Sequence, residues 1–107
     1  MNGIARNQMI PLLPDTACAD KLKVLADPTR LSVVEILMDG PKHVGAINER
    51  LGVEQTLLSH HLKVLREAGL VEAVRDGKAV EYRLAEGIVA TRSGKSINLG
   101  CCRLSFE

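Results

Sequence analysis

The periodicity of apolar residues becomes helical after residue 16 and predicts two consecutive helices. Leu22, Leu25 and Ala26 form one stripe with Cys18 one turn earlier, at the spacing of a buried helix face. The Asp-Pro pair at 27–28 then begins a second helix, because Asp accepts hydrogen bonds from its first free amides and Pro fits its first turn. The apolar face of this second helix is formed by Leu31, Val34, Leu37 and Met38.

Two shorter helical segments and a hairpin follow. Residues 44–51 and 55–68 both repeat apolar positions three and four apart. Two short helices joined by a tight turn that contains Gly are typical of a helix-turn-helix, although other helical bundles contain the same corner. Strands over 71–75 and 78–84 are predicted on either side of the Asp-Gly turn at 76–77, because both residues tolerate positive φ angles.

Beyond residue 84 the periodicity weakens. Residues 86–96 are rich in Gly, Ser and Thr, which predicts a loop or a poor helix, and weak alternation over 97–106 predicts a strand. We therefore divide the chain into a flexible arm over 1–16, a helical domain with a β-hairpin over 17–84, and a tail with cysteines over 85–107.

Composition supports one mainly helical domain. The 107 residues suffice for one domain, and 46% of them are hydrophobic. Only Tyr82 and Phe106 are aromatic, so the core must be aliphatic, which favours packed helices over an aromatic-rich sheet. The net charge of +1 excludes a strongly basic tail but allows a local basic patch.

No apolar run reaches the roughly 18–20 residues that cross a bilayer, and no secretory signal is recognisable. We therefore expect a cytoplasmic protein without a membrane partner.

The segment that begins at Gln55 has two faces when it is drawn as a helix at about 100° per residue. Its apolar face contains Leu57, Leu58, Leu62, Val64 and Leu65. Its other face carries hydrogen-bonding and positively charged side chains, namely Gln55, Thr56, Ser59, His60, Lys63 and Arg66. Such a face fits a DNA major groove, where Gln and Lys reach base edges and Ser or Thr reach phosphates.

Arg75 and Lys78 flank the hairpin turn, where a wing meets the DNA backbone or minor groove. The alternative is that the polar helix face is simply solvated. The order of helices followed by a charged hairpin favours the DNA interpretation, because each piece then has a docking role.

The three histidines differ in their expected surroundings. His60 lies on the polar face, where a DNA contact and plain solvation are both reasonable. His61 projects into the apolar face, where a buried histidine is usually structural. His43 is expected to be exposed, and no second histidine or carboxylate accompanies it at the spacing of metal ligands. We therefore expect no histidine metal site.

Three sequence blocks resemble the ArsR/SmtB family of small bacterial repressors. These are Leu-Ala-Asp-Pro-Thr-Arg-Leu at 25–31, Leu-Ser-His-His-Leu-Lys-Val-Leu-Arg-Glu-Ala-Gly-Leu-Val at 58–71, and Asp-Gly-Lys at 76–78 with Tyr-Arg-Leu at 82–84. The resemblance implies a winged helix-turn-helix fold and a homodimer that represses transcription from a double-stranded operator with dyad symmetry. It places the polar residues from Gln55 to Lys63 on the recognition helix and residues 76–78 at the wing tip.

Two effector sites of that family are absent from this chain. One uses cysteines at the start of the helix before the recognition helix, but residues 41–46 contain none. The other uses Asp, His and Glu on a C-terminal dimerisation helix, but residues 85–107 contain no His, and their glycines argue against a long helix.

The cysteines Cys18, Cys101 and Cys102 remain as effector ligands. An odd number of cysteines in a cytoplasmic protein does not indicate a disulfide framework, so these are thiols, ligands or redox groups. In the family fold the first helix and the C-terminal segment both lie at the dimer interface, so the cysteines can meet within or across subunits. Three thiolates favour a soft centre, and the chain is similar to arsenite-responsive members. Arsenite or antimonite is thus the expected inducer, with no constitutive cofactor.

The geometry of residues 97–106 decides between this site and its alternatives. In a regular strand Cys101 and Cys102 point to opposite faces, so both bind one centre only if the chain kinks, which Gly100 allows. Without a kink, one of them pairs with Cys18 to sense oxidants or persulfides. The plainest alternative is that Cys18 is a small core residue and the other thiols are incidental.

Two other classes of function are weaker interpretations. Vicinal cysteines also occur in small thiol-dependent reductases and metal-transfer proteins. However, the sequence contains no nucleotide fingerprint and places no base beside Cys101 or Cys102, so we expect no enzyme. A protein-interaction module with the same fold would not need the cationic helix face and wing.

Overall fold

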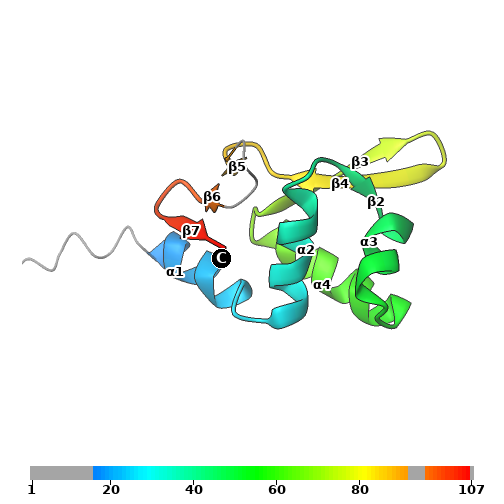
Figure 1. Ribbon diagram of the computed structural model, residues 1–107, viewed down its shortest axis with the longest axis horizontal. Coiled ribbons are helices and arrows are strands. Elements are labelled where there is room, and N and C mark those ends of the chain that lie inside the picture. The colour runs from blue at the N-terminus through cyan, green and yellow to red at the C-terminus, as the bar shows by residue number, and fades with distance from the viewer. Residues whose placement is uncertain (1–15, 92–95, 107) are drawn as a thin grey trace, which may run out of the picture.

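The computed structural model describes residues 16–91 and 96–106 and shows a mainly helical fold with a β-hairpin (Figure 1). Its helices are α1 (Thr16–Val24), α2 (Pro28–Leu37), α3 (Val44–Leu51) and α4 (Gln55–Glu67). Its strands are β2 (Lys42–His43), β3 (Val71–Asp76), β4 (Ala79–Leu84), β5 (Val89–Ala90), β6 (Ser96–Asn98) and β7 (Arg103–Ser105). The order of helices followed by a hairpin confirms the winged helix-turn-helix prediction. None of the described helices is long and apolar enough to cross a membrane.

The predicted hairpin is part of a three-stranded antiparallel sheet in the order β2-β4-β3. Strands β3 and β4 pair from Val71 with Leu84 to Asp76 with Ala79, and the turn places Gly77 at a φ of 64°. The short strand β2, which the sequence did not predict, pairs His43 with Glu81. We call β2, β3 and β4 the wing sheet. Figure 1 shows its β3–β4 hairpin projecting at one end of the molecule, away from α1 and β7.

The core is aliphatic, as the composition predicts. Helices α2, α3 and α4 supply most of its buried residues. The largest fully buried side chains include Leu37, Ile47, Leu58, Leu62 and Leu65. Tyr82 and Phe106 are only partly buried and pack against its margin. Among the described residues, His61 is the buried polar side chain, with 7% of its surface exposed.

The predicted buried stripe of the first helix is wrong in part. Helix α1 ends at Val24, so Leu25 enters the core from the following turn, where it is 4% exposed. Leu22 remains on the outer face of α1 and is 40% exposed, and Ala26 is also exposed. The flexible arm predicted over 1–16 lies outside the described residues, except for Thr16, which begins α1.

The single strand predicted over 97–106 is also wrong. The segment forms a hairpin of β6 and β7, joined through Gly100 at a φ of 93°. The N–H of Leu99 donates to the carbonyl of Cys102 across this turn, at 2.8 Å. Strand β5 pairs with the other side of β6 in place of the expected loop or poor helix, although residues 92–95 lie outside the described range. Ile97 and Leu99 are 0% and 1% exposed, so this segment is anchored in the core.

Candidate DNA-binding surface and cysteine cluster

The Asp-Pro-Thr-Arg motif fixes helix α2 against its neighbours. The Oδ1 atom of Asp27 accepts the backbone N–H groups of Thr29 at 2.8 Å and Arg30 at 3.1 Å. The Arg30 guanidinium donates through Nε to the Val24 carbonyl at 2.7 Å and through Nη1 to Nδ1 of His61 at 3.2 Å. Because Arg has only donors, Nδ1 of His61 must be the acceptor. The buried histidine is therefore structural, as predicted, and its partner holds α4 to the start of α2.

The turn of the helix-turn-helix is closed by paired hydrogen bonds. The side chain of Asn48 accepts the N–H of Val53 and donates to the Val53 carbonyl, both at 2.9 Å. Glu54 then caps α4, because its carboxylate accepts the N–H groups of Thr56 and Leu57, both at 3.0 Å. These two hydrogen bonds, the one from Thr56 more than the one from Leu57, lower the pKa of Glu54 below its usual value. The first turn of α4 is thus held firmly in place.

Helix α4 presents the predicted polar residues to solvent. All of them are exposed, namely Gln55, Thr56, Ser59, His60, Lys63 and Arg66. Its buried face is formed by Leu58, His61, Leu62 and Leu65. Leu57 was expected on the apolar face, but 44% of its surface is exposed. A helix advances by about 100° per residue, so Leu57 stands to one side of Leu58, beyond the face that the core covers.

The wing carries its two predicted cations near its tip. Arg75 on β3 and Lys78 in the turn are both exposed. The neighbouring residue Asp76 is also exposed, so the tip has mixed charge.

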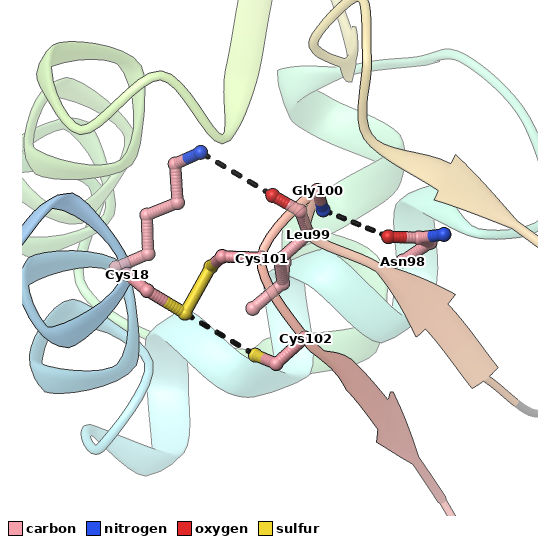
Figure 2. The surroundings of a disulfide bond; sticks show 7 residues. Cys18, Asn98, Leu99, Gly100, Cys101 and Cys102 are labelled. Carbon is pink, nitrogen blue, oxygen red and sulfur yellow. Dashed lines mark hydrogen bonds between the residues drawn. A yellow bond between two sulfur atoms is a disulfide. The ribbon is translucent and has the colours of Figure 1, made fainter. Parts of the chain in front are cut away.

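The structure brings the three cysteines together within one chain (Figure 2). Cys18 of α1 forms a disulfide with Cys101 in the β6–β7 turn, with an S–S distance of 2.07 Å. The free thiol of Cys102 lies 3.4 Å from the sulfur of Cys18, and all three sulfurs lie within 4.8 Å of one another. The kink at Gly100 lets both neighbouring cysteines face α1. The odd number of cysteines does not indicate a disulfide framework. In the structure, two of the three cysteines form a disulfide and the third is a free thiol.

The disulfide region has one further link between α1 and the tail. The Nζ atom of Lys21 donates to the carbonyl of Leu99 at 3.4 Å. Cys101 is exposed and Cys102 is half-buried.

A group that the sequence did not reveal lies on the wing sheet. The Nε2 atom of His43 lies 3.1 Å from Oδ2 of Asp76, and the ligand atoms of His43, Asp76 and Glu81 all lie within 4.8 Å of one another. Asp76 is 33 positions from His43 in the sequence. The expectation that no carboxylate accompanies His43 is therefore wrong. Strand β2 has only two residues and shows no periodicity from which its pairing could be predicted.

Comparison with known proteins places these features in one family. Residues 27–73 match the sequence pattern of the arsR family of bacterial regulatory proteins. The HTH-type transcriptional regulator CmtR of Mycobacterium tuberculosis is 35% identical over 85 residues, which cover 79% of this chain and 72% of that protein. This chain belongs to the ArsR family. The ArsR family and its fold are those of DNA-binding transcriptional regulators, which sets aside the reductase and metal-transfer alternatives.

Other bacterial proteins are similar over most of the described fold. The biofilm growth-associated repressor of Xylella fastidiosa is 43% identical over 72 residues, which cover 67% of this chain but only 63% of that protein. The crystal structure of the transcriptional repressor BigR from Xylella fastidiosa has a TM-score of 0.67 at 36% identity, covering 77% of this chain and 84% of that one. The homodimeric winged helix-turn-helix domain Mb0332 of Mycobacterium bovis has a TM-score of 0.64 at 34% identity, covering 77% and 75%.

Proposed function

We propose that this ArsR-family chain is a homodimeric repressor that binds double-stranded operator DNA and releases it when arsenite or antimonite binds Cys18, Cys101 and Cys102. A dimer is supported by the homodimeric Mb0332 domain, which shares the fold. Repression is supported by the similarity to the biofilm growth-associated repressor. The site of action is the cytoplasm, where operator DNA is found and where thiols are kept reduced.

The DNA-binding part of the proposal rests on the exposed face of α4. Two such helices in a dimer enter successive major grooves, and Gln55 and Lys63 reach base edges there. Thr56, Ser59, His60 and Arg66 contact the backbone or neighbouring bases. At the wing, Arg75 and Lys78 neutralise phosphates, so binding weakens as the salt concentration rises.

The effector part rests on the convergence of three sulfurs within 4.8 Å. When the Cys18–Cys101 bond is reduced by two electrons and two protons, three thiols stand around one point. The described ligand groups at this point include sulfur only, which suits a soft, thiophilic centre. Arsenite, As(OH)₃, exchanges its three hydroxides for the three thiols, so that three As–S bonds form in a pyramid and the hydroxides leave with the thiol protons as three water molecules. Arsenite is an inducer in this scheme and not a resident cofactor.

Induction then works by linkage between the cysteine cluster and the DNA-binding face. An effector that clamps the β6–β7 hairpin to α1 favours a dimer whose recognition helices no longer match the operator. It can shift that equilibrium only by its difference in affinity for the two states. A coupling of about 1–3 kcal/mol would weaken operator binding roughly 5- to 150-fold.

A second candidate, thiol redox or persulfide sensing, is favoured by the disulfide itself. Cys18 and Cys101 are directly bonded, so an oxidant that removes two electrons and two protons from their thiols would produce this state. The two candidates need different sulfurs. Redox sensing through this bond needs Cys18 and Cys101, whereas a three-coordinate arsenic also needs Cys102.

Fluorescence anisotropy on the promoter upstream of its own gene tests both candidates. The reduced protein should bind, and stoichiometric arsenite should release it. The Cys102→Ser variant should bind DNA normally and lose the arsenite response, but it should still respond to an oxidant if the redox candidate is correct. The Cys18→Ser variant should lose both responses. A reduced protein that binds tightly and ignores arsenite would exclude the metalloid proposal.

The same assay tests the assigned DNA-binding face. A Ser59→Ala, Lys63→Ala double variant should lose specific binding, while gel filtration should show an intact dimer. Unchanged affinity in this variant would show that α4 is not the recognition helix.

A further inference from the structure

The solvent-facing side of the wing sheet gathers three metal-ligating side chains from three strands. In the antiparallel register, His43 on β2 stands opposite Glu81 on β4, and Glu81 stands opposite Val74 on β3. Directly paired residues project to the same face, and residues two apart on a strand share a face. Asp76, two residues after Val74, therefore shares the face of His43 and Glu81.

From this arrangement we propose that His43, Asp76 and Glu81 form a binding site for a borderline divalent transition-metal ion, with Zn²⁺ as its representative. The site is separate from the cysteine cluster, and the proposal does not rest on the proposed function. The proposal rests on one observation: an imidazole nitrogen and two carboxylate oxygens all lie within 4.8 Å of one another.

The distances suit one small ion. Zn²⁺ binds imidazole nitrogen and carboxylate oxygen at roughly 2.0–2.2 Å, which puts two tetrahedral ligand atoms about 3.3 Å apart. The separation of His43 Nε2 and Asp76 Oδ2 is 3.1 Å. Their side chains are 45% and 63% exposed, so they can turn toward an ion without disturbing the core. Three protein ligands leave a fourth position for water.

The donor set selects the class of metal. An imidazole with two carboxylates carries two negative charges when the histidine is neutral, which a divalent cation balances. Imidazole suits Zn²⁺, Ni²⁺ and Co²⁺, whereas Ca²⁺ and Mg²⁺ prefer oxygen alone and arsenite prefers sulfur. The chain would thus carry two sites of different chemical preference.

A simple surface ion pair explains less of this arrangement. It accounts for His43 and Asp76, but it leaves Glu81 as a second acid beside them. Arg83, the basic residue two positions along β4 on the same face, is already paired with Glu72 at 3.3 Å. Within the described residues, no ion pair joins a Lys or Arg to Asp76 or Glu81. A cation between the acids removes their repulsion.

Binding would also have a mechanical consequence for the wing. Strand β2 leads directly into α3, the first helix of the helix-turn-helix. An ion held by β2, β3 and β4 would tie the wing hairpin to that helix. Zn²⁺ would displace the proton on Nε2 of His43, because that nitrogen now donates to the Asp76 carboxylate.

The test is an NMR titration of the full chain labelled with ¹⁵N-histidine, with its thiols alkylated so that sulfur cannot capture the metal. A Cys18→Ser, Cys101→Ser, Cys102→Ser variant serves as a second thiol-free form. Zn²⁺ should bind once per chain and shift the Nε2 resonance of His43, assigned with a His43→Gln variant. The resonances of His60 and His61 should not move, and Mg²⁺ should have no effect.

Matched variants decide whether all three ligands take part. Asp76→Asn and Glu81→Gln should each weaken Zn²⁺ binding by about tenfold or more. Glu67→Gln changes an exposed carboxylate at the end of α4, outside the cluster, so this variant should bind Zn²⁺ like the parent chain. No shift at His43 with millimolar Zn²⁺, or parental affinity in Glu81→Gln, would overturn the proposed site. Because the thiols are blocked and no DNA is present, either result is independent of the repressor proposal.

Discussion

At the scale of single residues, Asp27 holds the start of helix α2. Its carboxylate accepts two backbone N–H groups at 2.8 and 3.1 Å. Asp27→Ala should therefore lower the free energy of unfolding by about 0.5–2 kcal/mol. Asp27→Asn should cost less at neutral pH, because Asn still accepts a hydrogen bond at this position. Urea unfolding at a fixed protomer concentration measures both, and equal losses in the two variants would contradict the capping role.

The charge of Asp27 also gives these variants a defined pH dependence. The backbone N–H of Arg30, more than any other group, lowers the pKa of Asp27 below its usual value of 3.8. A carboxyl whose pKa is lower in the folded state stabilises the fold above its unfolded pKa and loses this contribution as the pH falls through the folded pKa. The stability difference between the parent chain and Asp27→Asn should thus be constant near neutral pH and shrink below about pH 4.

At the scale of one element, helix α4 places two adjacent leucines in opposite environments. Leu58 is 0% exposed and lies in the core, whereas Leu57 is 44% exposed. Leu58→Ala should lower the free energy of unfolding by about 2–5 kcal/mol, because it leaves a cavity. Leu57→Ala should change it by no more than about 0.5 kcal/mol. Urea unfolding of the two variants makes the comparison, and a large loss in Leu57→Ala would show that another surface covers this residue.

Helix α4 also shows what a sequence pattern can predict within an element. Apolar positions at helical spacing predicted that Leu58, Leu62 and Leu65 are buried, because apolar residues recur with the period of the helix along the side that faces the core. The same pattern placed Leu57 wrongly, since the width of a buried face is set by the neighbouring helices. The pattern also could not predict that Arg30 contacts His61, because the two residues are 31 positions apart in the sequence.

At the scale of the whole molecule, the predictable parts were those encoded locally. Helix starts, the Asp-Gly turn and the three family blocks identified the winged helix-turn-helix. The pairing of β2 with β4 and of β5 with β6 was missed, because each involves a two-residue strand. The β2–β4 pairing brings His43 beside Glu81, whereas the turn between β6 and β7 brings Cys101 and Cys102 to Cys18 of α1. The residues of the sulfur cluster were predicted by elimination, but their meeting within one chain was not.

The Cys18–Cys101 disulfide makes the last prediction, which concerns the stability of the whole fold. The bond joins residues 83 positions apart, so it restricts the unfolded chain strongly. A disulfide typically stabilises a protein by roughly 2–4 kcal/mol, and a loop as long as this one favours the upper end of that range. The oxidised protein should therefore unfold at higher urea than the reduced protein, at equal protomer concentration. Cys102→Ser should keep this difference and Cys101→Ser should lose it. If Cys102→Ser loses it instead, Cys102 is the partner of Cys18 in solution, and Cys102→Ser no longer separates the redox candidate from the metalloid candidate, because both then need Cys102.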